Sequence, residues 1–293
     1  MNFATWLTAC ETSVNLHTTA LLRQGQAGSQ RSRQSGSGFR FKQYTAYRPG
    51  DLRRFIDWKA SRKADTLLLR QFEHEARLDV MAICDLSTSM HFGYNPPKLR
   101  LALDCTGILG LAASRQGHAF GLMTFAADVI SHIPPRQHKG AIVHALAHLW
   151  ELSRRYTASY GTQLKPILRV LASQKPQLIC LMSDFRMPDW RPVLRTLRAV
   201  HDLIVVFVED PAETRIANRG RIALRDLERG QFIYLDTASA TVRHHYREQA
   251  ESERASCLYD LRHICGSQSL VTTTSADYAG DLVRFLMTRT MHR

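Results

Sequence analysis

Residues 78–89 read LDVMAICDLSTS, an apolar run that is followed at once by a carboxylate and two serine hydroxyls. The run up to Cys84 is rich in strand-forming side chains and too short for a typical helix. Because it is almost unbroken rather than alternating, it predicts a strand buried on both faces, as in a parallel sheet covered by helices. Asp85, Ser87 and Ser89 then follow the carboxyl end of that strand, where open α/β sheets bind their ligands.

The same rhythm continues on both sides of this segment. Short apolar runs predict strands near residues 78–85, 119–125, 177–183, 203–208 and 268–273. Helical spacing of apolar residues predicts helices at 98–115, 139–150, 164–171, 190–200, 240–264 and 278–287. Strands that alternate with helices favour a Rossmann-like α/β fold, with a mainly parallel sheet and helices on both faces. Residues 209–238 break the alternation, and we expect a β-hairpin there on the sheet edge.

The first part of the chain has a different character. Helical spacing over residues 3–24 gives way to a Gly- and Ser-rich loop at 25–38, and residues 39–75 are dense in charges and aromatic rings, with a short strand expected at 67–72. We therefore expect a small amino-terminal region over residues 1–77 and a main domain over 78–293. Trp58 and Phe72 are the expected packing anchors between them.

Amino-acid composition excludes several classes of protein for this chain. The 293 residues are 44% hydrophobic and 22% charged, which excludes a disordered or collagen-like chain. The formal net charge of +13 favours an acidic partner: nucleic acid, a membrane surface or an acidic protein. The six cysteines form no CxxC pair, and Cys84 and Cys180 lie within apolar runs, so neither a disulfide framework nor a zinc cluster is expected. With no apolar stretch of about 18 residues and no signal-peptide pattern, we expect a cytoplasmic protein.

Polar residues that follow two strands are the strongest sign of chemistry. We expect a single site formed by five oxygen-bearing side chains, Asp85, Ser87, Ser89, Thr162 and Asp184. Thr162 follows a glycine at an expected helix start, and Asp184 follows the strand at 177–183. Hydroxyl and carboxylate oxygens are hard ligands that suit Mg²⁺ or Mn²⁺ rather than zinc. The simpler alternative is that the serines cap the next turn and Asp85 merely ends a strand.

The set resembles the metal-ion-dependent adhesion site of von Willebrand factor A domains. That resemblance implies that Ser87, Ser89 and Thr162 bind the metal directly and that Asp85 and Asp184 act through water. It also implies that an acidic side chain of a partner fills the sixth position. The cation would then be bound weakly when no partner is present.

A second signature lies upstream: Tyr47-Arg48-Pro49-Gly50-Asp51, then Ile56-Asp57-Trp58. It resembles the block Y-x-P-G-D-D-x-R-x-I-D-W of the bacterial family called "domain of unknown function 58", although Leu52 replaces the second Asp. The resemblance implies a short amino-terminal region before a von Willebrand A-like domain, and an association with MoxR-type AAA+ ATPases. From the residues alone, structural packing is the favoured role of this block over a direct interaction site.

Three functions remain open at this point. The first is a metal-dependent protein-binding module, an accessory factor to a MoxR-type AAA+ ATPase in protein maturation or chaperoning, with an acidic client protein as an alternative partner. The second is a metal-dependent phosphohydrolase, although no general base, P-loop, G-x-S-x-G or H-E-x-x-H pattern accompanies the oxygen ligands. The third is nucleic-acid binding, which the net charge and the arginines among aromatic residues favour. We expect the first function, and not an enzyme.

Overall fold

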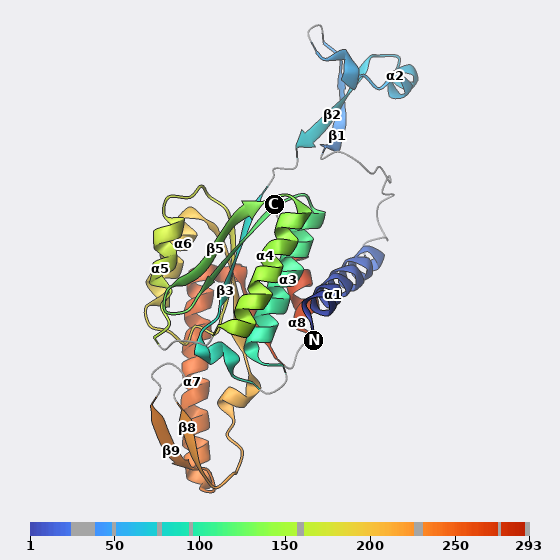
Figure 1. Ribbon diagram of the computed structural model, residues 1–293. Helices are drawn as coiled ribbons and strands as arrows, with labels where there is room; N and C mark the ends of the chain where they lie inside the picture. Colours follow the sequence, from blue (N-terminus) through green and yellow to red (C-terminus); the bar gives the residue numbers. More distant parts are fainter. Residues whose placement is uncertain are drawn as a thin grey trace. The chain divides into compact units, whose positions relative to one another are not determined.

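The computed structural model describes residues 1–24, 39–48, 51–74, 78–93, 96–156, 161–225, 231–274 and 277–290. The chain divides into two compact units (Figure 1). The larger unit comprises Met1–Gln26 and Leu78–Arg293, and the smaller one comprises Ala27–Arg77. No helix in the described ranges combines the length and apolar character needed to cross a bilayer.

A six-stranded sheet with the order β10-β7-β6-β3-β4-β5 forms the centre of the larger unit. Its strands are β3 (Asp79–Asp85), β4 (Ala119–Phe125), β5 (Val129–Arg136), β6 (Leu178–Ser183), β7 (Asp202–Glu209) and β10 (Ser269–Thr273). Every neighbouring pair is parallel except β4 and β5. The mainly parallel α/β sheet predicted from the sequence is therefore confirmed, and β5 is its antiparallel edge.

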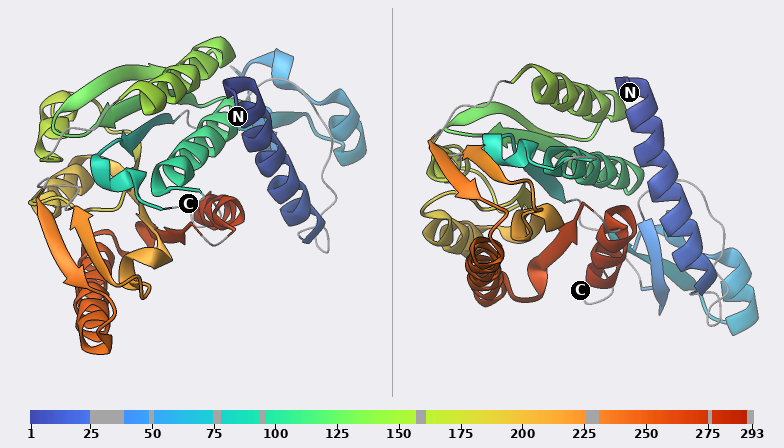
Figure 2. Two further views of the ribbon diagram at one scale, coloured as in Figure 1. Left: turned by 60° about the horizontal axis from the view of Figure 1, so that its bottom comes forward. Right: turned by 90° about the horizontal axis from the view of Figure 1, so that it is seen from below.

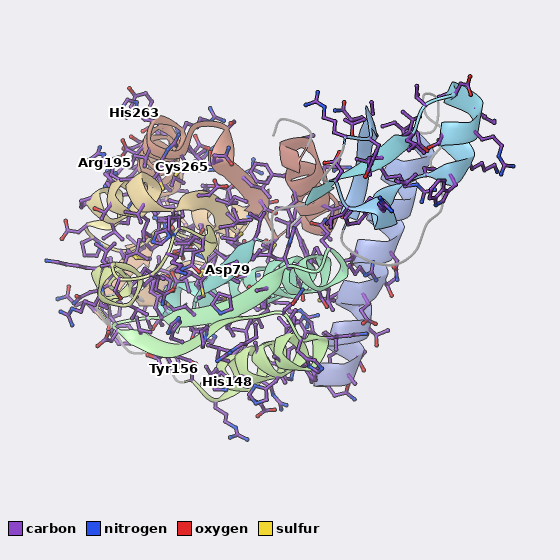
Figure 3. All side chains as sticks on the ribbon, turned by 90° about the horizontal axis from the view of Figure 1, so that it is seen from above. Asp79, His148, Tyr156, Arg195, His263 and Cys265 are labelled. Atoms are coloured by element: carbon purple, nitrogen blue, oxygen red, sulfur yellow. The ribbon has the colours of Figure 1, made fainter. Side chains whose placement is uncertain are left out.

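Alternate residues of β3 point into two separate cores. Val80, Ala82 and Cys84 belong to one buried cluster, and Met81 and Ile83 belong to the other. The first cluster is covered by α1 (Phe3–Gln24), α3 (Lys98–Arg115), α4 (Lys139–Arg155) and α8 (Tyr278–Thr290), and the second by α5 (Lys165–Leu171), α6 (Trp190–Val200) and α7 (Ala240–Cys265). Figure 3 shows Asp79 of β3 between His148 of α4 on one side and His263 of α7 on the other. This double covering explains the continuous apolar run in the sequence.

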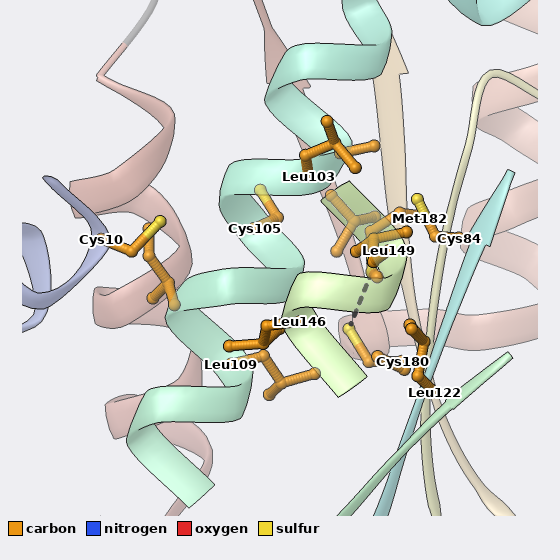
Figure 4. Packing of buried hydrophobic residues seen from close by; sticks show 14 of the residues in the cluster. Cys10, Cys84, Leu103, Cys105, Leu109, Leu122, Leu146, Leu149, Cys180 and Met182 are labelled. Atoms are coloured by element: carbon orange, nitrogen blue, oxygen red, sulfur yellow. Dashed lines mark hydrogen bonds between the residues drawn. The ribbon is translucent and has the colours of Figure 1, made fainter. Parts of the chain in front are cut away.

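The cysteines behave as small apolar side chains. All six are free thiols, and Cys10, Cys84, Cys105 and Cys180 lie together in the first core (Figure 4). Cys180 Sγ lies 3.6 Å from Met182 Sδ. Burial raises the pKa of Cys10 to about 12 and raises that of Cys84 further still. These thiols therefore remain protonated and serve packing.

The expected boundary at residue 77 needs one correction, because α1 belongs to the larger unit. Trp6 is fully buried, donates from Nε1 to Asp104 Oδ1 at 2.5 Å, and stacks on Trp150 with ring centroids 5.1 Å apart. Gly107 of α3 permits this close packing, since a Cβ there would lie 2.8 Å from Cys10 Sγ. The helical pattern of residues 3–24 is thus confirmed, but its apolar face covers α3.

The smaller unit is built around an antiparallel pair, β1 (Phe39–Ala46) and β2 (Leu68–His74), with η2 (Arg53–Phe55) and α2 (Trp58–Ala64) between them. The strand expected at 67–72 is confirmed as β2, whereas β1 was not predicted. Trp58 is 66% exposed within the structure. The side chain of Phe72 and the packing of one unit on the other lie outside what the structure describes, so the two proposed anchors stay predictions.

The hairpin expected within residues 209–238 is present, but not on the sheet edge. β8 (Arg221–Arg225) and β9 (Phe232–Asp236) pair only with each other among the described strands and form a sheet of their own (Figure 2). The edge strands of the main sheet are β10 and β5 instead. The apolar residues of β9 are largely exposed, with Tyr234 at 81%. The sequence pattern thus predicted the hairpin itself correctly but not its place in the fold.

Candidate functional site

The site lies where the order of the sheet reverses. From β3 the chain adds β4 and β5 on one side, and it then returns to place β6 on the other. In open α/β sheets such a reversal leaves a crevice at the carboxyl ends of the two central strands. Asp85 ends β3 and Ser183 ends β6, and the parallel register from Val80↔Leu178 to Cys84↔Met182 brings these ends side by side.

Asp85 organises the turn after β3. Its side chain is fully buried, and its Oδ1 accepts the backbone N–H of Ser87 at 2.8 Å, while its Oδ2 accepts the hydroxyl of Ser183 at 2.6 Å. The short helix η3 (Thr88–His91) follows. Its tight turn leaves the hydroxyl oxygens of Ser87 and Ser89 buried and 3.1 Å apart. Neither serine caps η3 through its side chain, contrary to the simpler alternative for Ser87.

Asp184 stands beside Asp85, directly after the serine to which Asp85 is bonded. It is 3% exposed, and its Oδ1 accepts the backbone N–H of Arg186 at 3.1 Å. The next residue, Phe185, has the left-handed value φ 53°, which turns the chain sharply away from β6. Ring contacts to Trp190 and Phe207, with centroids 5.0 and 6.3 Å away, support this turn. The backbone turn therefore fixes the position of the second carboxylate.

Thr162 reaches the same sheet edge through the backbone. The N–H of the next residue, Gln163, donates to Ala126 O at 2.9 Å, just beyond the end of β4. The last residue of β4, Phe125, pairs with Asp85 and accepts the N–H of Leu86 at 2.9 Å. Thr162 is 1% exposed. It lies in the turn before α5 rather than in the first turn of the helix, which begins at Lys165.

Lys98 was not predicted to belong to this region. Its side chain is fully buried, and its ammonium lies 2.6 Å from Asp184 Oδ2 and 2.6 Å from Glu213 Oε1. Glu213 lies in η4 (Pro211–Thr214), which is closed by a capping box with Asp210. A signal was present in the sequence: a lysine begins a helix whose other residues are mostly apolar, and the amino end of a helix disfavours a cation. Such a lysine requires a buried acidic partner.

The charge balance of the site centres on Asp85 and Lys98. Burial, and then the charge of Asp184, raise the pKa of Asp85 to about 7, while the bonds from Ser183 and Ser87 oppose the shift. Burial lowers the pKa of Lys98, but the charges of Asp184 and Glu213 outweigh that effect and leave it raised. The site therefore holds more negative charge than its one ammonium balances, and an added cation fits this electrostatic need.

The donor set determines which cation fits. Within the described ranges no three His, Cys, Asp or Glu side chains gather into a metal cluster, so a metal bound here would need hydroxyl or water ligands besides carboxylates. The available hydroxyls belong to Ser87, Ser89 and Thr162, and the carboxylates to Asp85 and Asp184. Such a set of hard oxygen donors suits Mg²⁺ or Mn²⁺.

Three other nearby acids have structural roles. Glu209 pairs with Arg254 through both carboxylate oxygens, at 2.5 and 2.8 Å. Asp210 caps η4 and accepts the hydroxyl of Thr274 at 2.8 Å. Asp128 is exposed and accepts the backbone N–H of Val129 at 2.7 Å.

The family block in the smaller unit also forms a structural network. Asp57 caps α2 by accepting the N–H groups of Lys59 and Ala60, each at 3.1 Å. Its other oxygen accepts the hydroxyl of Tyr44 at 2.9 Å and Nε of Arg70 at 2.8 Å. The bonds from Ala60, Arg70 and Tyr44 lower the pKa of Asp57 to about 2. This geometry agrees with the structural role favoured for the block. Pro49 and Gly50 lie outside the described residues.

Comparison with solved structures finds weak similarity to several proteins, one of which is described as a VWA domain. A crystal structure of BatB from Bacteroides thetaiotaomicron shares 16% identity, with a TM-score of 0.46 over 73% of this chain and 98% of that one. The SpRpn10 VWA domain shares 13% identity, with a TM-score of 0.41 over 70% of this chain and 94% of that one. The α/β architecture expected from the sequence, a mainly parallel sheet with helices on both faces, is confirmed by the strand order and pairing of the structure itself.

Among curated proteins, the uncharacterized protein Mb1516 of Mycobacterium bovis is 24% identical over 248 residues, which cover 83% of this chain and 77% of that protein. The uncharacterized protein MAV169 of Mycobacterium avium is 30% identical over 110 residues, covering 37% and 64% of the two chains. The family model described as "Protein of unknown function DUF58" matches residues 43–256, a span that includes both the Asp57-Trp58 block and the five oxygen-bearing residues. The chain therefore belongs to the DUF58 family.

Proposed function

We propose that this protein is a metal-dependent protein-interaction module. Von Willebrand A-like domains generally mediate contacts between proteins, which supports the broad class. In the proposed site, Ser87, Ser89 and Thr162 bind Mg²⁺ or Mn²⁺ directly, and Asp85 and Asp184 hold it through water. The cation supplies an electrophilic position that accepts a carboxylate from a partner.

The buried pair of Asp85 and Asp184 is the observation that carries this proposal. Burial and the neighbouring charge raise the pKa of Asp85 to about 7. The ionised form of Asp85 is therefore less stable here than that of a carboxylate in solvent. A divalent cation relieves that repulsion and favours the ionised form. Since the three direct protein ligands are all neutral hydroxyls, the bound cation keeps much of its charge for an acidic partner.

The partner we propose is a MoxR-type AAA+ ATPase, with this protein as its accessory factor in protein maturation or chaperoning. One support is that the Tyr47–Asp51 and Ile56–Trp58 segments resemble the sequence block of the DUF58 family, which implies an association with such ATPases. Another is the net charge of +13, which favours encounter with an acidic surface. The alternative partner is an acidic client protein, whose carboxylate would bind the same cation.

Calorimetric titration with Mg²⁺ tests the metal site directly. Wild type is compared with the double variant Asp85→Asn, Asp184→Asn and with Asp128→Asn, which changes an exposed acid after β4. We expect wild type and Asp128→Asn to bind Mg²⁺ and the double variant to lose binding. Equal heats for wild type and the double variant would remove the metal from the proposal.

A second experiment tests the partner. A MoxR-type ATPase from the same genome is immobilised, and retention of this protein is compared in Mg²⁺ and in a chelator. We expect retention in Mg²⁺ to exceed retention in chelator, and the Asp85, Asp184 double variant to match the chelator result. If retention is the same in Mg²⁺ and in chelator, and the same for wild type and the double variant, the proposed role of the site is contradicted.

A further inference from the structure

Lys98 is a buried ammonium that binds one of the two carboxylates of the candidate metal site. It begins α3 and reaches Asp184 Oδ2 and Glu213 Oε1, each at 2.6 Å, with no exposed surface. Its Nζ also lies 5.8 Å from the centre of the Phe92 ring. A lysine so fully removed from water is stable only while its acidic partners remain in place.

The geometry makes Asp184 a shared group. Its Oδ1 accepts the N–H of Arg186, which leaves Oδ2, the atom nearest Lys98, in contact with the ammonium. Any cation held near Asp184 must therefore share that carboxylate with a positive charge that is already present. Two cations that share one carboxylate repel each other, and in a buried site with little solvent this repulsion is large.

Glu213 adjusts how strongly Lys98 depends on Asp184. It is the second acceptor of the same ammonium, and its side chain also accepts the N–H of Asp210 at 3.4 Å within η4. The Glu213 carboxylate offsets part of the charge of the lysine, because it lies 2.6 Å from the same ammonium. Without that charge, Lys98 would act on Asp184 alone.

We propose that Lys98 is a built-in competitor that sets the affinity of this site for divalent cations, and that Glu213 moderates it. The inference rests on the metal site of the proposed function, but it predicts opposite changes in metal affinity for two different variants. Removing the lysine charge strengthens metal binding, and removing the charge of Glu213 weakens it. A lysine and a glutamate that only stabilised the fold would shift binding in the same direction, or not at all.

The test is the dissociation constant for Mg²⁺, measured by calorimetry, and for Mn²⁺, measured by electron paramagnetic resonance of the free ion. The variants are Lys98→Met, which keeps the length of the side chain, and Glu213→Gln, which keeps an oxygen acceptor for Asp210. Arg191→Met is the matched control, since it breaks a different ion pair of the same unit, with Asp260. Lys98→Arg should retain the wild-type constant, because it keeps the charge.

We expect Lys98→Met to bind either ion at least about tenfold more tightly than wild type, and Glu213→Gln several-fold more weakly. Circular dichroism checks that each variant is folded. A folded Lys98→Met variant with unchanged or weaker binding would overturn the proposal. Should Lys98→Met not fold without metal, Glu213→Gln decides, and unchanged or tighter binding there would overturn it.

The outcome separates this inference from the proposed function. Metal binding by Lys98→Met but not by wild type would support the role of Lys98 and contradict the metal-dependent function of the natural protein. Binding by wild type that Asp85→Asn, Asp184→Asn abolishes, together with no gain in Lys98→Met, would do the reverse.

Discussion

Lys98 Nζ donates to Asp184 Oδ2 at 2.6 Å across 86 positions of sequence, and both side chains are almost completely buried. This bond joins the first turn of α3 to the turn after β6. It also brings a positive charge to the edge of the sheet where the candidate metal ligands gather. The chemistry of the site therefore depends on a residue that lies outside the five oxygen-bearing positions.

Replacing Thr162 with Ala should weaken metal binding without unfolding the protein. The side chain is buried at the edge of the sheet, and the change removes one hydroxyl while leaving the Gln163–Ala126 backbone bond in place. We expect the dissociation constant for Mg²⁺ to rise by at least about 10-fold, because even residues that only support metal ligands contribute about 10–100-fold to affinity. Calorimetry measures the constant, and thermal unfolding in chelator checks the fold. Unchanged affinity would remove Thr162 from the ligand set.

Adding a methyl group at Gly107 should loosen α1 from α3. The new Cβ would lie 2.8 Å from Cys10 Sγ and 3.0 Å from the Trp6 ring. We expect Gly107→Ala to lower the free energy of unfolding by about 1–3 kcal/mol, as overpacked cores do. Denaturant unfolding measures the loss. Adding Cys10→Ala should recover part of it, and a loss that Cys10→Ala does not reduce would place the strain elsewhere.

The smaller unit should lose stability in strong acid through Asp57. The pKa of this carboxyl is about 2 in the folded protein, below its ordinary value of 3.8, because of bonds from Ala60, Arg70 and Tyr44. A lowered pKa contributes stability that is fully present above about pH 4 and is lost as the pH falls through about 2. The amide signal of Ala60 followed by NMR should report this change. Asp57→Asn should lack it, and an identical acid profile in the variant would assign the change to another group.

Thiol labelling should distinguish Cys257 from the other five cysteines. Cys257 is half-buried, whereas the others are buried. Burial raises its pKa to about 11, so the reaction should be slow at neutral pH and should accelerate as the pH rises. Mass spectrometry after brief treatment with iodoacetamide should find Cys257 labelled first. Early labelling of Cys84 or Cys180 would mean that the core opens more readily than the packing indicates.

The sequence located the sheet well, for a physical reason. β3, β4, β6 and β7 lie within a residue or two of their predicted positions, because strands buried on both faces appear as unbroken apolar runs. β10 was also located within a residue, although it is a half-buried edge strand. β1 was missed because charged residues interrupt its aromatic ones, a pattern that also suits a loop. The hairpin was wrongly placed on the edge of the main sheet, because pairing between distant strands depends on the whole fold.

The candidate site was predicted in part for a similar reason. Asp85, Ser87, Ser89 and Asp184 follow strands, so the direction of the parallel strands alone brings them to one edge. Lys98 and Glu213 are joined across 115 positions, and no spacing rule connects residues so far apart. Their role required knowledge of which helix end faces which turn.

The alternation of β3 between two cores has a further consequence for the site. Val80, Ala82 and Cys84 on one face and Met81 and Ile83 on the other are all buried, so this strand has no exposed side along which to open locally. Its amide hydrogens should exchange with solvent only through global unfolding. Asp85 is held at the end of the strand by that same packing, so an arriving ligand finds it already ordered and loses little conformational entropy there.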